Sequence, residues 1–427
     1  MKDSAEQLYA IYKLHPKVCT DTRTIIPDSI FFALKGGSFN ANEFAEQALK
    51  NGCKYSVIDE EKYKKDERFI LVDDVLKSLQ ELAKYHRSQL KIPFIGITGT
   101  NGKTTTKELI KTVLSKKYIT LATTGNLNNH IGVPLTILSV TDAVEIAVIE
   151  MGANHVGEIA MLCEIAQPDY GIITNIGKAH LEGFGSFEGV IKAKSELYQY
   201  IKKTKGKVFV NADNELLSKL LEGIEKITYG TSEKSNCRGE VTEVNPFMKI
   251  TFSGENIASH LPGRYNAENI LCAICVGGFF GVEMKSIKQA IEEYIPSDNR
   301  SQLVKKRSNT LLLDAYNANP TSMEASVSNF ADMDLPNKVL IIGDMFELGN
   351  FSKTEHEKIL KLIFQKNFSK ILLIGAEFCE AGKNSAYKLF KNSQEAFDWL
   401  KKNPIENSTI LIKGSRGMKL EKVVEAL

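Results

Sequence analysis

The sequence lacks the features that mark secreted, membrane-spanning or nucleic-acid-binding proteins. Its 7 cysteines are an odd number without regular spacing, which argues against a disulfide framework and favours free thiols in a reducing cytoplasm. No apolar run approaches the roughly 20 residues of a membrane span, and the N-terminus has no signal-peptide core. Lysine and arginine number 54 against 52 aspartates and glutamates, so no excess of positive charge indicates nucleic acid as a partner.

Internal repeats and low-complexity tracts are also absent. Cys272 and Cys275 have the spacing of half a zinc site, but they lie in an apolar helical stretch and no second pair accompanies them. Hydrophobic residues make up 43% of the 427 residues and charged residues 25%, which is ordinary for a globular protein. The length is enough for two or three domains, and we expect a monomer.

Strand-like and helix-like stretches divide the chain into three segments. Residues 1–88 carry short apolar runs at 29–34 and 69–72 with small helices between them. Residues 89–296 and 297–427 alternate strands with helices, which is typical of parallel βαβ units. The expected strands are 94–98, 119–123, 145–150, 170–175 and 207–211 in the second segment, and 310–314, 339–344, 371–375 and 410–414 in the third.

This pattern predicts an α/β protein of three domains. The first is a small N-terminal α/β domain, the second is a central domain with a mostly parallel sheet, and the third is a C-terminal Rossmann-like α/β domain. Residues 296–299, Pro-Ser-Asp-Asn, are the expected linker between the second and third domains. Ligands of such open sheets bind beyond the carboxyl ends of the strands, where several polar clusters fall.

A phosphate-binding loop is the most informative feature of the chain. An apolar strand leads into a glycine-rich turn, and the turn leads into a helical stretch at 107–114. Backbone N–H groups and Lys103 would bind the polyphosphate of ATP, and the Thr104 hydroxyl would bind Mg²⁺. The spacing departs from the standard pattern, because Ile97 stands where the first glycine is expected. The alternative is a turn without a ligand. The predicted ATP-binding residues are Gly99, Thr100, Asn101, Gly102, Lys103, Thr104 and Thr105.

Two side chains at the ends of the following strands are candidate metal ligands. The strand at 145–150 is apolar until it closes on Glu150, and a carboxylate beside a phosphate loop can hold Mg²⁺ directly or through water. Glu150 could instead be a solvated strand end. His180 follows the next strand by a few residues and lies on the same rim, where a ligand role competes with a structural one.

Lys194 is a less obvious candidate. The stretch 187–201 has the spacing of an amphipathic helix, with Leu197 and Ile201 in its apolar stripe. Lys194 falls in the middle of that stripe, and Lys192 falls on the opposite face. A lysine among apolar side chains must snorkel, pair or lose its charge. A lowered pKa would make the amine nucleophilic, and reaction with CO₂ would give a carbamate, an anionic ligand for a second Mg²⁺.

Further polar side chains follow strands or open helices. Asn126 and Asn129 could bind phosphate oxygens or a polar substrate, or could belong to an Asx-rich turn. Asn266 opens a long apolar helix, which it could cap, or it could read an adenine edge. A last set lies in the third segment: Arg300 at its start, Asp314, Asn317 and Asn319 after one strand, and Lys413 on the last strand.

Together these residues resemble the Mur ligases, the ATP-dependent amide-forming enzymes of peptidoglycan precursor synthesis. The resemblance covers nearly the whole chain and rests on 98–104, Glu150, Asn175 to His180, Lys194, 263–266, Arg300 and Asp314. Three stretches, 125–135, 150–153 and 316–323, resemble the branch of the family that adds D-alanyl-D-alanine. The Asp-Asn-Pro-Arg motif of diaminopimelate-adding members is absent. Departures are Thr22 where serine is common, Tyr265 where histidine is common and Leu313 where a first aspartate is often found.

The resemblance implies a function and a site. UDP-N-acetylmuramoyl-tripeptide and D-alanyl-D-alanine would be joined at the cost of ATP through an acyl phosphate. Asn266, Arg300 and Asp314 would lie around adenine, phosphate and ribose. One Mg²⁺ would be held by Thr104 and Glu150, and a second by His180 and a carbamate on Lys194. The N-terminal domain would bind UDP through Thr22, Arg23 and Lys35, and the dipeptide would meet Asn126, Asn129, Asn317 and Asn319.

Other functions remain open at this point. Folylpolyglutamate synthases share the implied fold and the acyl-phosphate route, although they typically lack the short N-terminal UDP domain and the Tyr-Asn-Ala-Asn-Pro cluster at 316–320. Another step of the Mur pathway is a second possibility. A nucleotide switch that hydrolyses ATP without ligating anything is a third.

Overall fold

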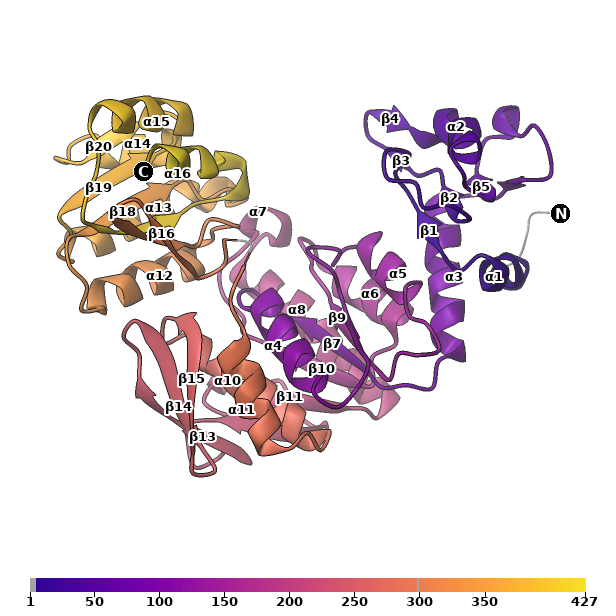
Figure 1. Ribbon diagram of the computed structural model, residues 1–427, viewed down its shortest axis with the longest axis horizontal. Helices are drawn as coiled ribbons and strands as arrows, with labels where there is room; N and C mark the ends of the chain where they lie inside the picture. Colours follow the sequence, from indigo (N-terminus) through magenta and orange to yellow (C-terminus); the bar gives the residue numbers. More distant parts are fainter. Residues whose placement is uncertain (1–4, 298) are drawn as a thin grey trace.

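The computed structural model describes residues 5–297 and 299–427. Within these residues the strands form a four-stranded, a nine-stranded and a six-stranded sheet, here called the N-terminal, central and C-terminal sheets, and a two-stranded ribbon. The N-terminal and C-terminal sheets stand apart at two ends of the molecule, and the central sheet joins them (Figure 1). Asp298, in the predicted linker, lies outside the described residues. Among the described helices, none combines the length and apolarity that a membrane-spanning segment requires.

The N-terminal sheet is parallel, in the order β1-β2-β5-β6. Its strands β2 and β6 coincide with the apolar runs predicted at 29–34 and 69–72. The elements here are α1 (Ala5–Leu14), β1 (Val18–Cys19), β2 (Ile30–Phe32), the ribbon β3 (Lys35–Gly36) with β4 (Phe39–Asn40), the 3-10 turn η1 (Ala41–Phe44), α2 (Ala45–Lys50), β5 (Tyr55–Ile58), η2 (Glu61–Tyr63), β6 (Phe69–Leu71) and α3 (Val75–Gln89). Helix α3 packs against α1 on one side and against α5 and α6 on the other, so it connects this sheet to the central one.

The central sheet contains all five strands predicted in the second segment. They are β7 (Phe94–Thr98), β8 (Thr120–Ala122), β9 (Ile146–Glu150), β10 (Tyr170–Ile173) and β11 (Lys207–Asn211). With β12 (Glu225–Gly230) they pair in parallel in the order β12-β11-β10-β7-β9-β8. Strands β10, β7 and β9 are therefore neighbours, and the polar residues that follow them meet at one edge of the sheet.

The outer part of the central sheet is not foreseen by the sequence pattern. Strand β13 (Cys237–Glu243) pairs in parallel with β12, and β14 (Phe247–Phe252) and β15 (Glu255–Pro262) continue in antiparallel register. Most residues of β13 are exposed or half-buried. The strand therefore lacks the continuous apolar run by which the buried strands were recognised.

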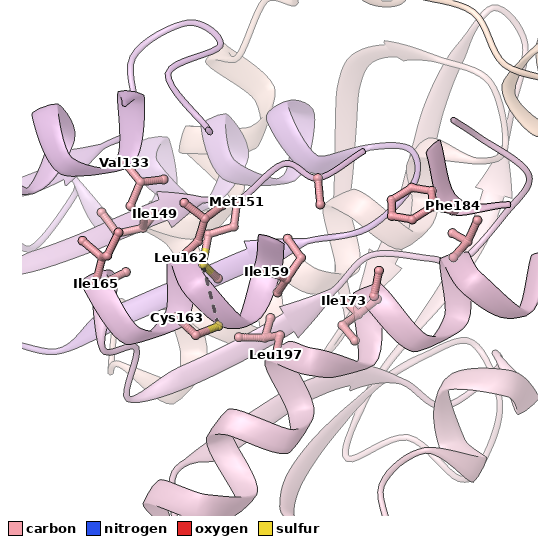
Figure 2. Close-up of a cluster of buried hydrophobic side chains, with 14 of the residues drawn as sticks. Val133, Ile149, Met151, Ile159, Leu162, Cys163, Ile165, Ile173, Phe184 and Leu197 are labelled. Atoms are coloured by element: carbon pink, nitrogen blue, oxygen red, sulfur yellow. Dashed lines mark hydrogen bonds between the residues drawn. The ribbon is translucent and has the colours of Figure 1, made fainter. Parts of the chain in front are cut away.

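Helices cover both faces of the central sheet. On one face lie α5 (Gly132–Ile137), α6 (Glu158–Ala166), α7 (Leu181–Phe184) and α8 (Phe187–Thr204); on the other lie α4 (Lys103–Leu114), α10 (Asn266–Phe279) and α11 (Met284–Glu293), with α9 (Glu215–Lys219) after β11. Figure 2 shows the first face, where Ile149 and Met151 from β9 and its end pack against Leu162 and Cys163 of α6. Leu197 of α8 belongs to the same core, so the helix carrying Lys194 is fixed against the sheet.

The C-terminal sheet has the order β16-β17-β21-β18-β19-β20, in which only the β16–β17 pair is antiparallel. All four strands predicted in the third segment are present. The elements are β16 (Gln302–Lys306), β17 (Asn309–Leu313), α12 (Pro320–Asp332), β18 (Lys338–Gly343), η3 (Gly349–Phe351), α13 (Ser352–Phe364), β19 (Lys370–Ile374), α14 (Ala376–Gly382), β20 (Lys388–Phe390), α15 (Ser393–Lys402), β21 (Thr409–Lys413), η4 (Arg416–Met418) and α16 (Glu421–Ala426). The α/β fold with a mostly parallel central sheet is confirmed.

Candidate active site

A cavity of about 630 Å³ lies where the central and C-terminal sheets meet. The loop between β7 and α4, the ends of β9 and β10, the start of α10 and the loop after β17 all contribute to its wall. The predicted site residues that line it are Thr100, Asn101, Gly102, Lys103, Thr104, Thr105, Asn126, Asn129, Glu150, His180, Asn266, Arg300, Asp314, Asn317 and Asn319. Residues separated by more than 200 positions in the sequence are thus brought to one cavity.

Two glycines give the loop between β7 and α4 its shape. Gly99 has φ of 141°, and a Cβ there would lie 2.0 Å from the Thr174 hydroxyl oxygen. Gly102 has φ of 78° immediately before α4, and its Cβ would lie 2.7 Å from Oδ1 of Asn269. Both positions need glycine for conformation and for space. The N–H groups that open α4 have no partner within the helix, as at any helix start. The loop therefore presents backbone donors to the cavity despite its non-standard glycine spacing.

Asn175, at the end of β10, holds this loop in place. Its side-chain oxygen accepts from the Asn101 N–H at 3.0 Å, and its amide nitrogen donates to the Asn101 carbonyl at 3.1 Å. The Thr174 hydroxyl donates to the same carbonyl at 2.6 Å. Thr100 exchanges hydrogen bonds with Gly177 through its hydroxyl, at 2.9 and 3.1 Å. The loop is thus rigidly joined to the neighbouring strand.

Lys103 lies at the first position of α4 and folds back over the loop. Its ammonium donates to the carbonyls of Gly99 at 2.8 Å and Thr100 at 3.1 Å. Burial lowers the pKa of Lys103; the Glu150 carboxylate opposes this shift and the Arg300 guanidinium adds to it. The Lys103 amine therefore lies next to the backbone N–H donors of the loop and close enough to Glu150 and Arg300 to be affected by their charges. An anionic ligand bound to the loop would contact this amine.

Glu150 is the buried carboxylate of the site. The Thr104 hydroxyl donates to its two oxygens at 2.9 and 3.2 Å, and the Asn128 amide donates at 2.8 Å. Lys107, one helical turn after Lys103, is fully buried and places its ammonium 3.8 Å from Glu150 while donating to the Thr123 carbonyl at 2.5 Å. Two hydrogen-bond donors and a cation therefore hold this carboxylate beside the phosphate loop.

The start of α10 faces the cavity from the other side. Asn266 is the first helical residue and does not cap the helix; its amide donates to the Pro262 carbonyl at 2.7 Å. Its oxygen accepts from Asn269, whose own oxygen accepts from the Thr106 hydroxyl of α4 at 3.0 Å. The Tyr265 hydroxyl lies 3.0 Å from that of Ser301. The buried amides thus link α10 to α4.

The C-terminal sheet brings two charged groups to the cavity. Asp314, just after β17, accepts from the Lys413 ammonium at 2.5 Å and from the Ser326 hydroxyl at 3.1 Å. Arg300 stacks over the ring of Tyr316, with the guanidinium carbon 3.5 Å from the ring centroid. The buried Lys413 neutralises Asp314, so this carboxylate enters the cavity in a fixed orientation.

His180 and Lys194 are the predicted second metal pair, and both lie against the ring of Phe184. The His180 ring meets it edge to face at 6.3 Å between centroids, and the Lys194 ammonium lies 5.3 Å from its centroid. Phe184 is labelled in Figure 2 at the end of the same apolar core. Nδ1 of His180 lies 2.5 Å from a Glu347 oxygen, an ion-pair contact without hydrogen-bond alignment. Within the described ranges, no hydrogen bond or ion pair joins His180 to Lys194.

Lys194 is buried in the apolar stripe, as its helical position predicts, with 2% of the residue exposed. Its only hydrogen bond among the described residues goes to the Ala153 carbonyl, at 3.4 Å. Burial lowers its pKa to about 7, and Lys103 adds to the shift. Ala153 lines the cavity and Lys194 does not, so the amine lies just behind the wall.

The sequence matches two parts of one family. Residues 97–277 match the Mur ligase middle domain, and residues 299–416 match the Mur ligase glutamate ligase domain. The UDP-N-acetylmuramoyl-tripeptide–D-alanyl-D-alanine ligase of Bacillus subtilis (strain 168) is 34% identical over 424 residues, covering 96% of this chain and 92% of that protein. The chain belongs to the Mur ligase family.

Solved structures of Mur ligases agree with this assignment. The chain is similar to MurF from Acinetobacter baumannii, with a TM-score of 0.85, 29% identity, and coverage of 96% of this chain and 92% of that one. It is also similar to MurF ligase from Thermotoga maritima in complex with ADP, with a TM-score of 0.83, 26% identity and coverage of 97% of both chains. The resemblance stated from the sequence is confirmed.

Within this Mur ligase, the four predicted dipeptide-contacting asparagines differ in how much of their hydrogen-bonding capacity is already used. Asn129 accepts from the N–H groups of Ile131 and Gly132 at 3.1 and 2.9 Å, as in an Asx turn. Asn319 caps α12 and donates to Asn101. Asn126 and Asn317 are exposed and have no side-chain hydrogen bond among the described residues. The latter two are free to meet a ligand.

The predicted UDP contacts lie in the N-terminal part, outside this cavity. Arg23 is 87% exposed and pairs with Asp21 at 2.6 Å. Lys35, on the ribbon, lies 2.9 Å from Asp59 and 3.1 Å from Glu60. Thr22 is half-buried. The structure therefore does not bring Thr22, Arg23 and Lys35 to the phosphate loop.

Three residues of the Mur ligase site were not predicted as ligand contacts. Lys107 follows Lys103 by four positions on the same helical face, and that i, i+4 spacing is the sequence signal that points to it. Asn128 lay inside the recognised asparagine-rich turn, but only the fold points its amide at Glu150. Lys413 ends the last predicted strand, and its pairing with Asp314 follows from the β17–β21 register.

Proposed function

We propose that this chain joins D-alanyl-D-alanine to UDP-N-acetylmuramoyl-tripeptide and converts ATP to ADP and phosphate, a cytoplasmic step in making peptidoglycan precursors. The name of its Bacillus subtilis relative and the MurF structures support this substrate pair. One observation carries the proposal: the phosphate loop places Thr104 against Glu150 in the same cavity that Arg300 and Asp314 enter from the C-terminal sheet.

We assign one substrate to each segment. Residues 1–88 would bind the UDP part through Thr22, Arg23 and Lys35, residues 89–296 would bind ATP, and residues 297–427 would close over the nucleotide. The exposed positions of Arg23 and Lys35 support the first assignment, because a polyanion could replace their present carboxylate partners.

ATP would lie along the loop from Gly99 to Thr105. Its phosphates would receive backbone N–H groups at the start of α4, where the helix dipole favours an anion. Lys103 would then exchange its two carbonyl acceptors for phosphate oxygens. Asn266 would face adenine, Arg300 phosphate and Asp314 ribose, and Lys413 would keep Asp314 oriented.

The residues present fit one Mg²⁺ beside the loop. Thr104 and Glu150 supply a hydroxyl and a carboxylate, the oxygen ligands that Mg²⁺ prefers. Among residues 5–297 and 299–427, no group of three or more His, Cys, Asp or Glu side chains is arranged to hold a metal ion. Phosphate oxygens and water would therefore complete the coordination, as is usual for Mg²⁺ bound with a nucleotide.

A second Mg²⁺ would need Lys194 in a different chemical form. The neutral amine of Lys194 can attack CO₂, forming an N–C bond as one C=O π bond opens and one proton is released, which gives a carbamate whose single negative charge is shared by two oxygens. Burial favours the neutral amine, and Phe184 places Lys194 on the same side of the core as His180. His180 would leave Glu347 to share this site. When bound, Mg²⁺ supplies positive charge that draws the γ-phosphate and the substrate carboxylate together.

The chemistry follows from the charges that meet in the cavity. The tripeptide's terminal carboxylate attacks the γ-phosphorus, the bond to the β,γ-bridging oxygen breaks and ADP leaves. The resulting acyl phosphate has a good leaving group that the free carboxylate lacks. The amine of the dipeptide then attacks the carbonyl carbon, and phosphate leaves. Lys103 and the loop N–H groups stabilise the charge on the transferred phosphoryl group. Closure of the C-terminal sheet over the cavity would exclude water, which otherwise hydrolyses the acyl phosphate.

A phosphate-release assay tests the proposal. We expect ADP and phosphate only when UDP-N-acetylmuramoyl-tripeptide and D-alanyl-D-alanine are both present with ATP and Mg²⁺. Turnover with folate and glutamate would favour a folylpolyglutamate synthase, and turnover with a dipeptide precursor and an amino acid would favour another Mur step. Phosphate release without any acceptor would favour a nucleotide switch.

A further inference from the structure

The N-terminus of α12 contacts two loops of the central sheet at once. Nδ2 of Asn319 donates to Oδ1 of Asn101 in the phosphate loop at 2.8 Å. The Thr321 hydroxyl accepts from the Lys178 N–H in the loop after β10 at 2.8 Å. A Cβ at Gly177 would lie 2.7 Å from that hydroxyl, so the two loops and the helix fit closely. This contact spans the seam between the central and C-terminal sheets.

The hydrogen bonds of Asn319 leave little of its side chain for a substrate. Oδ1 accepts from the Ser322 N–H at 2.8 Å, and the Ser322 hydroxyl lies 3.1 Å from the Asn319 nitrogen, which completes a capping box. One amide hydrogen goes to Asn101. The side chain is thus fixed to α12 by its oxygen and to the phosphate loop by its nitrogen.

Asn101 is equally constrained on its side of the seam. Its backbone N–H and carbonyl are both held by Asn175, and its carbonyl also accepts from Thr174. A change in the loop's backbone when phosphates bind would therefore move the Asn101 side chain with it. The only side-chain hydrogen bond of Asn101 among the described residues is the one to Asn319.

Helix α12 continues the connection to the other side of the cavity. Ser326, further along the same helix, donates to the Asp314 carboxylate at 3.1 Å. Through Asn319 and Ser326, helix α12 therefore contacts both the phosphate loop and Asp314. A shift at the start of α12 would change both contacts.

We propose that Asn319 is a positioning residue that couples the phosphate loop to the C-terminal sheet through Asn101, with Thr321 holding the adjacent loop, and that it does not bind the dipeptide. The inference deepens the proposed function, on which it rests for the identity of the substrates. Two residues of the loop between β17 and α12 then have different roles. Asn319 supports nucleotide binding, and the exposed Asn317 is free to bind the dipeptide.

The test is a set of variants measured by ATP titration and by steady-state kinetics. Asn319→Ser keeps a capping oxygen but cannot reach Asn101. Asn101→Ala removes the partner, and the double variant completes a cycle. Asn317→Ala, two residues away, is the contrasting variant, for which we expect a raised dipeptide KM and unchanged ATP binding. We expect Asn319→Ser to weaken ATP binding and raise the ATP KM by about fivefold to tenfold, the loss of one hydrogen bond. The dipeptide KM should stay within about twofold.

The cycle distinguishes coupling from a local effect. We expect the double variant to bind ATP no more weakly than the worse single variant, and the thermal midpoint of Asn319→Ser to match the wild type, whereas Asn319→Ala lowers it through loss of the cap. A raised dipeptide KM with unchanged ATP binding, or fully additive single effects, would overturn the inference. The ATP titration needs no second substrate, so failure of the ligase assay alone would refute the proposed function and leave this inference to be judged separately.

Discussion

The phosphate loop and the corner formed by His180 and Lys194 differ in how completely the folded chain assembles them. In the loop, two glycines with positive φ, Asn175 and the Thr104–Glu150 contact fix every part relative to the others. In the second corner, His180 is paired with Glu347 and Lys194 rests on a carbonyl and on Phe184. The phosphate loop is therefore already formed before a ligand binds, whereas His180 and Lys194 would first have to leave their present partners.

This difference has a physical cause. The loop is built from backbone groups and short side chains, which need no charge partner and are held by neighbouring strands. The pair formed by His180 and Lys194 offers two nitrogen bases, which are poor ligands for Mg²⁺ until the Lys194 amine is converted to an anionic carbamate. We therefore expect the phosphate loop to depend on backbone conformation and the site of His180 and Lys194 to depend on chemical modification.

Changing the modified side chain is expected to have the largest effect. Lys194→Ala should nearly abolish ligation, by on the order of 10³-fold or more in kcat/KM, because it removes the ligand for a charge at the reacting phosphate. Added bicarbonate should not restore activity, and short carboxylic acids should restore part of it by occupying the ligand position. Steady-state assays with each additive measure this.

Lys192→Ala is the matched control, because Lys192 is exposed on the opposite face of α8. It should retain wild-type activity. In ¹³C-bicarbonate, the wild type should give a carbamate carbon resonance that Lys194→Ala lacks. Wild-type-like ligation by Lys194→Ala would contradict the claim that the site of His180 and Lys194 depends on a modified lysine.

The next largest effect is expected at the preformed corner. Lys103→Ala should lower kcat/KM for ATP by about 10²–10³-fold, the usual cost of losing a cation from transition-state charge. Lys111→Ala, on an exposed position of the same helix, is the control and should leave the rate unchanged. A loss below about threefold for Lys103→Ala would contradict the placement of the loop.

A smaller effect, on stability, tests whether the loop depends on conformation. Gly99→Ala should lower the free energy of unfolding by about 2–4 kcal/mol, because it adds both positive-φ strain and a clash with Thr174. Gly125→Ala is the control: its φ is 55° and a Cβ there meets nothing within 4 Å, so only the strain of about 1 kcal/mol remains. Urea unfolding measures the free energy of unfolding of both variants. Equal losses in the two variants would argue against a close contact between Gly99 and Thr174.

The smallest effect is expected far from both corners. Arg23→Ala should raise the KM for the UDP substrate by about threefold to tenfold and leave the ATP KM unchanged, as for the loss of one charge-assisted hydrogen bond. Arg68 makes the same exposed pair with Asp66 that Arg23 makes with Asp21. Arg68→Ala is therefore a control that should change neither value. Equal effects of the two substitutions would assign Arg23 a structural role.

The sequence predicts the buried strands because short, continuous apolar runs, such as the one that precedes Glu150 in β9, are typical of strands inside a parallel sheet. It predicts the phosphate loop because glycines and Gly102-Lys103-Thr104 act through local backbone geometry. It does not predict β12 to β15, whose mixed exposure hides the strand pattern.

The partners of each site residue are harder to foresee than the residues themselves. Asn319 was predicted as a substrate contact, but its side chain is used by the capping box and by Asn101, more than 200 positions away. The pairing of His180 with Glu347 likewise depends on how the C-terminal sheet meets the central one. Such contacts follow from tertiary packing, which no local pattern records.

Calorimetric titration of the protein with ATP, with and without Mg²⁺, measures whether the phosphate loop binds a nucleotide together with its metal. We expect one nucleotide site whose affinity rises at least tenfold with Mg²⁺, because Thr104 and Glu150 complete the metal site only beside the bound phosphates. We expect this binding to be lost in Lys103→Ala, which removes the cation beside the loop. Absence of Mg²⁺-dependent ATP binding, or unchanged binding in Lys103→Ala, would contradict the proposed nucleotide site.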